Sequence, residues 1–223
     1  RREALVDGHY STKMYMSALC AAWDHYHLVS KRDFQDHDFY CYHAPIPRLV
    51  EKAHARLKKH CNAQESESDN GIDATLTYSR TVGNCYTASL YLTLLSLLDH
   101  HPEDMSGKRI GFYSYGSGCV AEFFSGVVQP TYRDVLNARD NQQRLADRTP
   151  LTYQEYEAFY KHQLPTDGDH FVASVPREGR FRLAGVERHQ RVYENKQDAQ
   201  YSAKAPGKLI LSGEYAVMYG CPA

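Results

Sequence analysis

The sequence predicts a layered α/β fold in which sheets sandwich a central, buried helix. The decisive segment is Thr87–Leu98, which is apolar nearly all round and has five leucines from Leu92 to Leu98, both ends counted. A helix without a polar face is buried on all sides. Helical and strand-like segments are also mixed along the chain, and a hydrophobic fraction of 42% with a mean hydropathy of -0.61 is typical of a globular domain.

The first third of the chain predicts a helix, a strand and a second helix. Ser11 can cap a helix that runs to about Val29. The positions at helical spacing are Met14, Ala18, Ala21 or Ala22, and His25. Asp38–His43 is short, aromatic and strand-like, and a proline follows it. Pro47 then suits the first position of the next helix, which runs to about His60.

The middle of the chain predicts a loop, two strands that form a hairpin, and a short separate strand. Asn62–Asp73 is rich in Glu, Ser, Asp and Gly and has no apolar periodicity, which favours a loop. Ala74–Tyr78 fits a short strand. Ile110–Tyr115 is followed by the glycine turn Gly116-Ser-Gly118 and by Val120–Val128, so we expect these strands to pair as a hairpin.

The last part of the chain predicts two helices, one strand and a linker. The helices are Tyr132–Ala146 and Thr152–His162, the strand is Phe181–Tyr193, and the polar linker is Lys196–Gln200. A segment of different character follows the linker. We therefore expect one domain over residues 1–195, a linker over 196–201 and the start of another domain over 202–223.

Composition excludes several classes of function. With 26 Lys and Arg against 27 Asp and Glu, the net charge of -1 favours neither nucleic acid nor a membrane surface as partner. The longest apolar stretch lies within Leu90–Leu98, far short of the roughly 20 residues that span a bilayer. The chain opens without a signal peptide, and its six Cys include no CxxC pair. We therefore expect a cytoplasmic protein without a metal site or a disulfide framework.

Two positions early in the chain suggest binding chemistry. His43 ends a strand ahead of a proline, where α/β proteins gather their sites, and its imidazole can polarise a carbonyl oxygen or accept a proton. A packed or surface His is the commoner case. Arg48 and Lys52 lie four residues apart on one face near a helix N-terminus and can hold phosphates. A solvated basic face is again the commoner case.

Three further candidates lie just before the apolar helix and at the predicted hairpin turn. Asn84 can cap that helix or bind a carbonyl oxygen, and Cys85 beside it is either a small buried residue or a nucleophile. Gly116–Ala121 fits the form G-x-G-x-x-A of a dinucleotide site, but that site needs a helix next, and a strand is predicted there. We therefore expect a tight hairpin with Ser117 at its tip.

Five blocks of sequence, in order, resemble one enzyme family. The blocks are VDGHYSTKMYMSAL, DFYCYHAPIPRLVEKA, GNCYTASLYLTLLSLL, GKRIGFYSYGSG and FRLAGVERHQRVY. Together they resemble the C-terminal half of 3-hydroxy-3-methylglutaryl-CoA (HMG-CoA) synthase over about residues 1–195. The resemblance implies a thiolase-like fold of two similar halves, each built on a mixed sheet, with buried helices between the sheets. This agrees with the buried helix predicted at Thr87–Leu98.

The resemblance also implies a reaction that joins acetyl-CoA to acetoacetyl-CoA and releases HMG-CoA and CoA. A Cys takes the acetyl group, a Glu acts as acid and base in the condensation, and water releases the product. In the family this Cys and Glu belong to the N-terminal half, before Arg1. We therefore expect the chain alone to be inactive, its missing half to be its partner, and the complete enzyme to be a homodimer without a cofactor beyond its CoA thioester substrates.

Several residues match the family's substrate-contacting positions. His43 matches the His that binds and polarises the acetoacetyl group. Asn84 matches an Asn near the acyl oxygen, and Tyr86 matches its neighbour in that motif. Ser117 matches the Ser of the SYGSG turn. The positions implied to contact CoA are Lys52 and Arg48, and the latter stands where many members have Lys.

The end of the chain resembles a different family. Ser202–Gly220 is similar to the N-terminal motif of mevalonate kinases and other GHMP kinases, and Lys208 and Glu214 lie in that motif. Many mevalonate kinases have His after the Glu, whereas this chain has Tyr215. The chain lacks the superfamily's ATP loop, so ATP-Mg would concern only this incomplete part. A fusion of synthase and kinase is the expectation.

Other functions stay open at this point. A thiolase-like acyltransferase of the ketoacyl-synthase kind would share the fold and differ in the context of its nucleophile. A noncatalytic CoA-binding or dimer-forming module would share the fold and bind without reaction. Dinucleotide binding at Gly116–Ala121 ranks last.

Overall fold

The computed structural model describes residues 7–63, 72–137, 140–161, 168, 171–172, 181–195 and 202–205. The chain divides into two compact units, Arg1–Arg144 and Leu145–Ala223. Three sets of predictions lie wholly or mostly outside the described residues: the loop Asn62–Asp73, the linker Lys196–Gln200, and the kinase-like residues Lys208 and Glu214. No helix among the described residues is both long and apolar enough to cross a membrane.

The first unit combines helices with one three-stranded sheet. Its elements in chain order are α1 (Gly8–Ser30), η1 (Phe34–Asp36), β1 (Phe39–Tyr42), α2 (Pro47–His60), α3 (Ile72–Val82), α4 (Ala88–His100), β2 (Arg109–Gly116), η2 (Ser117–Cys119), β3 (Val120–Val127), α5 (Tyr132–Asn137) and α6 (Asn141–Ala146), which crosses into the second unit. The second unit continues with α7 (Tyr153–Lys161), β4 (Phe171–Val172), β5 (Phe181–Glu187), β6 (Gln190–Asn195) and β7 (Ser202–Ala205).

The sheet of the first unit is mixed, as predicted, and has the order β1-β2-β3. β1 runs parallel to β2, with Tyr42 opposite Tyr113. β2 and β3 form the predicted antiparallel hairpin. Parallel pairing brings the carboxyl ends of β1 and β2 to the same end of the sheet. The candidate residues His43 and Ser117 directly follow these two strand ends.

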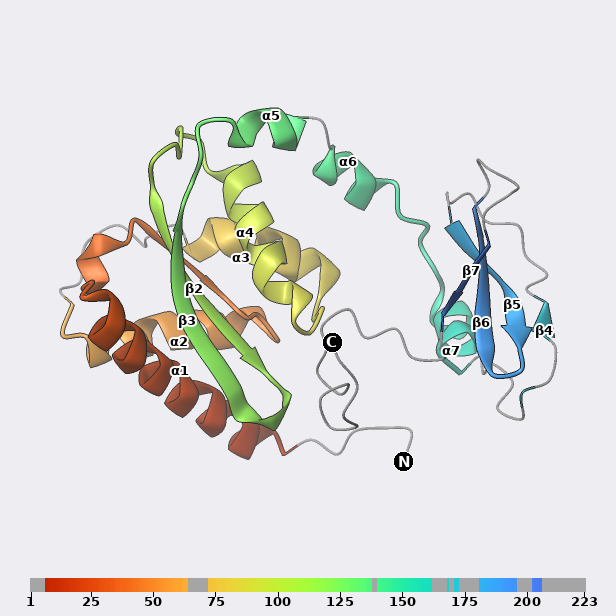
Figure 1. The fold of residues 1–223 in the computed structure, drawn as a ribbon, viewed down its shortest axis with the longest axis horizontal. Helices are drawn as coiled ribbons and strands as arrows, with labels where there is room; N and C mark the ends of the chain where they lie inside the picture. The colour runs from red at the N-terminus through yellow and green to blue at the C-terminus, as the bar shows by residue number, and fades with distance from the viewer. Residues whose placement is uncertain are drawn as a thin grey trace. The chain divides into compact units, whose positions relative to one another are not determined.

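Helices cover both faces of this sheet, with α1 and α2 on one face and α4 on the other (Figure 1). Side chains alternate along β1, so that Tyr40 and Tyr42 join the core under α1 and α2 while Phe39 and Cys41 join the core under α4. Within the first unit the layers are therefore helix, sheet and helix. The sequence predicted instead a helix between sheets, because the apolar helix was expected to need cover on every side.

Helix α1 is confirmed, but it begins earlier than predicted. Its cap is Asp7 and not Ser11: the Asp7 carboxylate accepts a hydrogen bond from the Tyr10 N–H at 2.9 Å. The face that is most buried also differs from the predicted one, because large side chains fill the space above the sheet. The buried residues of α1 are Tyr15, Leu19, Cys20 and Trp23.

The predicted strand Ala74–Tyr78 is wrong, because this segment lies inside helix α3. Ile72, Thr75, Leu76 and Ser79 are buried, at the spacing of one helix face. The threonines and the tyrosine favour a strand by intrinsic propensity. Packing along α4 outweighs that preference.

The apolar helix forms as α4, but within the described residues it is not buried on all sides. Its buried face carries three hydroxyl groups, those of Ser89, Thr93 and Ser96. On the opposite face, Tyr91 is 63% exposed and Leu95 is half-buried. The helix therefore has a polar stripe, but this stripe faces the protein interior and its apolar side is partly open.

Two predictions in the last part of the chain need correction. Tyr132–Ala146, predicted as one helix, forms the two short helices α5 and α6. Phe181–Tyr193, predicted as one strand, forms β5 and β6, which pair antiparallel. Arg188 and His189 join them with φ of 48° and 67°, the left-handed backbone that a two-residue hairpin turn requires. Helix α7 confirms the predicted helix Thr152–His162, and β7 pairs with β6.

A close approach inside the sheet gives a first testable prediction. A Cβ added at Gly111 on β2 would lie 2.9 Å from the Phe123 ring and 3.1 Å from the Tyr40 ring, whereas at Gly126 on β3 the nearest atom would be 3.6 Å away. We expect Gly111→Ala to lower the free energy of unfolding by about 1–3 kcal/mol, because the buried rings must move. Gly126→Ala is the matched control and should change little. Urea unfolding curves compare them, and equal midpoints would contradict the prediction.

Candidate functional site

His43 is held at the carboxyl end of β1 by its own backbone. Its N–H donates to the Tyr113 carbonyl on β2 at 2.8 Å, and its carbonyl accepts from the Tyr15 hydroxyl at 2.7 Å. The Tyr113 hydroxyl donates in turn to the Tyr15 carbonyl on α1 at 2.9 Å. Two strands and one helix therefore fix this residue, which is 8% exposed.

The ring of His43 is bound by the first turn of α4. Its Nδ1 lies 3.0 Å from Oγ of Ser89, and the same oxygen accepts from the Ala44 N–H at 2.9 Å. The rings of Tyr15 and Tyr115 are centred 6.4 and 6.1 Å from the imidazole. Burial lowers the pKa of His43, so the imidazole is neutral at neutral pH and carries one N–H donor.

Asn84 and Tyr86 shape the turn that leads into α4. The side-chain oxygen of Asn84 accepts a hydrogen bond from the Tyr86 N–H at 2.8 Å. The side chain of Tyr86 is exposed, and its backbone is in the left-handed region, with φ of 51°. The Tyr86 carbonyl then accepts from the Ser89 N–H at 3.0 Å. Asn84 therefore stabilises the turn before the helix rather than the helix end itself. Its amide nitrogen has no partner among the described residues, so it can donate to a ligand oxygen.

Ser117 lies in the η2 turn between β2 and β3, which confirms the predicted hairpin and excludes the helix that a dinucleotide site would need. Its side chain is outside what the structure describes. Gly118 and Cys119 complete the turn with φ of 77° and 58°. Tyr115, whose ring lies beside His43, is two residues before Ser117 on the chain. The turn therefore begins at the end of the sheet where His43 lies.

The basic pair Arg48 and Lys52 lies on the exposed side of α2, whose buried side packs in the core. The Arg48 guanidinium is 79% exposed and lies 3.2 Å from Glu51, which also pairs with Arg80 at 3.5 Å. Lys52 has no such ion pair among the described residues. Because α2 starts just after His43, both cations belong to the same stretch of chain as the imidazole.

The structure thus brings together some of the predicted residues and adds two that the sequence analysis missed. His43, the turn at Asn84 and the start of the η2 turn meet around the ends of β1, β2 and α4, whereas Lys208 and Glu214 lie outside the described residues. The missed residues are Ser89 and Tyr15, which hold the ring and the backbone of His43. The spacing of hydroxyl side chains along the apolar helix was the one available signal for Ser89.

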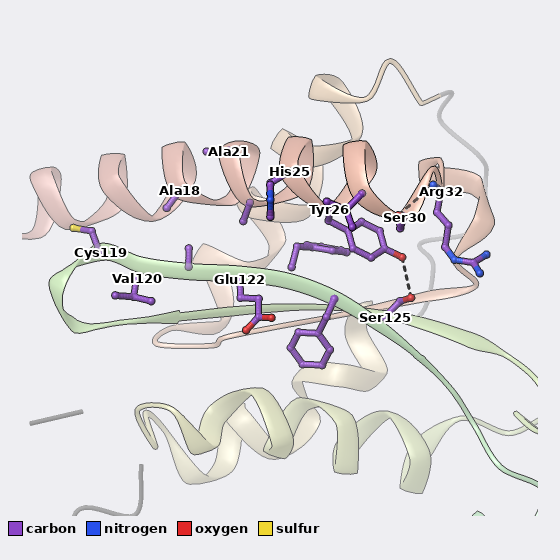
Figure 2. A pocket seen from close by; sticks show the side chains of 15 residues that line it. Ala18, Ala21, His25, Tyr26, Ser30, Arg32, Cys119, Val120, Glu122 and Ser125 are labelled. Atoms are coloured by element: carbon purple, nitrogen blue, oxygen red, sulfur yellow. Dashed lines mark hydrogen bonds between the residues drawn. The ribbon is translucent and has the colours of Figure 1, made fainter. Parts of the chain in front are cut away.

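A groove of about 890 Å³ lies elsewhere in the first unit, between α1 and the outer edge of β3. Figure 2 shows small side chains of α1, such as Ala18 and Ala21, above the strand, and the hydrogen bond of 2.8 Å from the Tyr26 hydroxyl to Ser125 at one end. His43 does not line this groove. The groove exists because β3 has one neighbouring strand in this sheet and alanines leave space above it.

The cysteines do not provide an obvious nucleophile or metal site in the described part of the chain. Burial raises the pKa of Cys41 and of Cys61 to about 12, so both thiols stay protonated at neutral pH. Cys85 is half-buried, and its thiol donates to the Gly83 carbonyl at 3.6 Å. Among the described residues, no three His, Cys, Asp or Glu side chains gather as metal ligands.

Comparison with known proteins gives the family. Residues 57–168 match the family model described as hydroxymethylglutaryl-coenzyme A synthase C terminal. The chain belongs to the hydroxymethylglutaryl-CoA synthase family. The matched region includes Asn84, Tyr86 and Ser117, while His43 and the basic pair of α2 precede it.

Curated relatives carry the same description over a longer stretch. The chain is 34% identical to the hydroxymethylglutaryl-CoA synthase of Enterococcus faecalis over 192 residues, which cover 86% of this chain and 49% of that protein. It is also 33% identical over 139 residues to PksG of Bacillus subtilis, described as a polyketide biosynthesis 3-hydroxy-3-methylglutaryl-ACP synthase, with 60% of this chain and 33% of that protein covered. The chain thus spans about half the length of the synthase from Enterococcus faecalis.

Solved structures confirm the fold implied by the resemblance for a C-terminal half. A crystal structure of HMG-CoA synthase complexed with CoA superposes with a TM-score of 0.76 at 31% identity, over 86% of this chain and 50% of that one. MvaS in complex with 3-hydroxy-3-methylglutaryl coenzyme A gives a TM-score of 0.72 at 34% identity, over 87% and 52%. The chain therefore has the thiolase-like α/β fold of this family over the half that it covers.

Proposed function

We propose that this chain is the substrate-binding C-terminal half of an acyltransferase that condenses acetyl-CoA with acetoacetyl-CoA to HMG-CoA and CoA. The observation that carries the proposal is the neutral imidazole of His43, which is buried and fixed through Nδ1 at the carboxyl ends of two parallel strands. The family membership supports it, as do related structures described with CoA and with the HMG-CoA product.

In the proposed reaction, the acetyl group is bound to the Cys of the N-terminal half, CoA having left when this thioester formed. The Glu of that half takes a proton from the methyl carbon, and the resulting carbanion attacks the ketone carbon of the acetoacetyl group. A carbon–carbon bond forms, the electron pair of the ketone moves to its oxygen, and the protonated Glu returns the proton to this oxygen. Water then cleaves the thioester to the Cys and releases HMG-CoA. A hydrogen bond from Nε2 of His43 polarises this ketone and stabilises the developing negative charge. Asn84, Tyr86 and Ser117 are proposed to bind the acyl group, and the unpaired amide nitrogen of Asn84 suits a carbonyl oxygen.

The nucleophilic Cys and the catalytic Glu are proposed to come from the N-terminal half of the synthase. The protonated thiols of Cys41 and Cys61 make both residues poor candidates for that nucleophile. The open side of α4 around Tyr91 supports a missing half, because an exposed apolar helix face favours contact with another protein surface. The isolated chain is therefore proposed to bind substrate without turning it over.

Binding of acetoacetyl-CoA to the chain tests the proposed function. Isothermal titration calorimetry should show that His43→Ala weakens the binding of acetoacetyl-CoA more than the binding of CoA, because only the acyl group is proposed to reach the imidazole. His25→Gln, an exposed substitution on α1, is the matched control. Equal effects of His43→Ala on both ligands would favour a noncatalytic CoA-binding module, and binding of neither ligand by the wild-type chain would contradict the proposal.

The basic pair on α2 is proposed to bind the phosphates of CoA. We expect Lys52→Gln to weaken CoA binding by up to about fivefold, since an exposed charge pair is worth about 0.2–1 kcal/mol. Lys59→Gln, on the last turn of the same helix, is the control and should change the dissociation constant little. The difference should vanish in high salt, which screens exposed charges. Equal effects of both substitutions would exclude a specific phosphate contact.

A second candidate function follows from the 33% identity with PksG, whose description names a 3-hydroxy-3-methylglutaryl group on an acyl carrier protein (ACP). The chain would then act on an acetoacetyl group carried by a protein rather than by CoA. Binding of acetoacetyl-ACP without binding of acetoacetyl-CoA would favour this thiolase-like alternative. The basic pair on α2 would then contact the carrier protein.

The organisation of the whole protein is also a proposal. We propose that residues 1–195 form the synthase part, 196–201 a linker, and 202–223 the start of a GHMP-kinase-like domain that contains Lys208 and Glu214. The support is the sequence of the last segment alone, since its first residues, Ser202–Ala205, form β7 and pair with β6 of the part proposed as synthase. ATP-Mg binding by a form of the protein that continues beyond Ala223 would test the kinase part, and sedimentation of the complete synthase would test the proposed cytoplasmic homodimer.

A further inference from the structure

The proton of the His43 ring decides what this residue can do. A neutral imidazole carries its proton on Nδ1 or on Nε2, and the hydrogen bond made by one nitrogen sets the state of the other. In His43 the bonded nitrogen is Nδ1, and its partner is the Ser89 hydroxyl. Nε2 has no partner among the described residues. The state of Ser89 therefore determines whether Nε2 is a donor or an acceptor toward a ligand.

The hydrogen bonds around Ser89 favour one arrangement. Its oxygen accepts from the Ala44 backbone N–H, which can only donate. Its own proton has one acceptor within hydrogen-bond distance among the described residues, which is Nδ1 of His43 at 3.0 Å. If Nδ1 carried the ring proton instead, the Ser89 proton would be left unpaired at a position with 0% exposure. Buried polar groups without partners are disfavoured, so the hydroxyl donates and Nδ1 accepts.

We infer that Ser89 is a positioning residue that holds His43 in the form protonated on Nε2 and so presents an N–H donor to the carbonyl oxygen of the acyl substrate. The backbone of Ala44 orients the hydroxyl, and the first turn of α4 supplies it. The ring also faces Tyr15 and Tyr115, but neither hydroxyl bonds to it: the first donates to the His43 carbonyl and the second to Cys119. The part of this inference that concerns substrate rests on the proposed function.

Nitrogen-15 NMR of the histidines, recorded without substrate at neutral pH, tests this assignment. In the wild-type chain Nδ1 of His43 should show the shift of an unprotonated ring nitrogen and Nε2 that of a protonated one. Ser89→Ala should remove the donor and shift both signals toward a mixture of the two forms. Ser89→Thr keeps a hydroxyl at the same carbon and should restore the wild-type pattern.

Thr93→Val is the matched control, because Thr93 is an equally buried hydroxyl on the same face of α4 that bonds to backbone carbonyls and not to His43. Its removal should leave the His43 signals unchanged. A ring proton on Nδ1 in the wild-type chain would overturn the inference even if Ser89→Ala fails to fold. Identical His43 signals in the wild type and in Ser89→Ala would overturn it as well. So would a shift of the His43 signals in Thr93→Val as large as that in Ser89→Ala.

A binding measurement on the same samples separates this inference from the proposed function. Ser89→Ala should weaken the binding of acetoacetyl-CoA by about tenfold and the binding of CoA hardly at all, since one hydrogen bond to the acyl oxygen is lost. Ser89→Thr should restore the affinity. If the wild-type chain shows the expected ring proton but no acetoacetyl-CoA binding, the proposed function is contradicted while the role of Ser89 toward His43 stands. If it binds acetoacetyl-CoA with Nδ1 protonated, the role of Ser89 is contradicted alone.

Discussion

Joined to the N-terminal half of a synthase, this chain is expected to make HMG-CoA, and alone it is expected to show no turnover above background. The experiment is a chimera in which this chain replaces the matching C-terminal part of the Enterococcus faecalis synthase. Release of CoA thiol from acetyl-CoA and acetoacetyl-CoA measures the rate. In this chimera we expect His43→Gln to lower kcat by about 100- to 1,000-fold, the usual loss when one donor to a developing oxyanion is removed.

The effect should fall on kcat more than on KM. In the proposed reaction the ketone oxygen gains negative charge as the new carbon–carbon bond forms, so a hydrogen bond from His43 would be stronger in the transition state than in the bound substrate. The neutral state of the ring matters here. Burial lowers the pKa of His43, so the proposed donor is an N–H of an imidazole that is neutral at neutral pH. The rate should therefore not require protonation of this residue.

His25→Gln in the same chimera is the control for a general effect of losing an imidazole, and it should leave kcat unchanged. A chimera that folds, binds both thioesters and stays inactive would contradict the proposed function. Turnover by the isolated chain would contradict the proposal that the nucleophile comes from the other half. A loss confined to KM in His43→Gln would show that the imidazole binds substrate without stabilising the transition state.

The elements that local chemistry determines were predictable from the sequence. Asp38–His43 has aromatic residues and a proline after it, and it forms β1 with His43 directly behind. Pro47 starts α2 as predicted, since its missing N–H has no partner to lose in a first turn. The hairpin of β2 and β3 follows from the glycine turn. His43 could be singled out because a strand end followed by proline is a local pattern.

The errors have one physical origin. Tertiary contacts determine the secondary structure and the buried face of a segment where its local sequence does not. Ala74–Tyr78 looks like a strand, but Ser96 of α4 accepts from the Tyr78 N–H and donates to the Ala74 carbonyl, so the segment packs as a helix along α4. The face of α1 was misjudged for a related reason. The sequence indicates this helix by alanines at helical spacing, whereas Trp23 and other large side chains occupy the core and the alanines line the groove.

The residues proposed to contact the substrate were predictable from the sequence, but the residues that hold them in place were not. His43 and Asn84 could be found from their own neighbours in sequence, but Ser89 lies 46 residues from His43 and its role depends on where α4 packs. A single serine within an apolar helical sequence gives no sign of a role in a site. The fold places Ser89 on the buried side of α4, 3.0 Å from Nδ1 of His43, and from this contact we infer that it determines which nitrogen of the ring carries the proton.

Lowering the pH from 7 to 4 is expected to remove about 3 kcal/mol of folding stability through His54 alone. Burial lowers the pKa of His54 from 6.5 to about 4. Its ring packs among Phe34, Tyr40 and Tyr42. Nδ1 bonds to the Tyr42 hydroxyl at 2.9 Å, and Nε2 is buried without a partner among the residues that the structure describes. A charged imidazole there would lose its hydration without gaining an acceptor.

The sign and the pH window of this effect follow from the lowered pKa. Between about pH 6.5 and pH 4 the unfolded chain binds a proton at residue 54 that the folded chain does not, so the free energy of unfolding falls as the pH falls. The loss should reach about 2 kcal/mol at pH 5 and level off below pH 4. His37 and His43 are also buried with lowered pKa values, so they act in the same direction.

A matched pair of variants isolates the contribution of His54. His54→Gln keeps an acceptor for the Tyr42 hydroxyl but cannot be protonated, so its free energy of unfolding should depend on pH less steeply than that of wild type, by about 2 kcal/mol between pH 7 and pH 5. His9→Gln changes an exposed imidazole on α1 and should follow the wild-type profile. Urea unfolding at constant ionic strength gives the three profiles. Parallel profiles for wild type and His54→Gln would mean that the folded protein accommodates a charged ring at this position, and the buried, unpaired Nε2 would then have to gain an acceptor in acid.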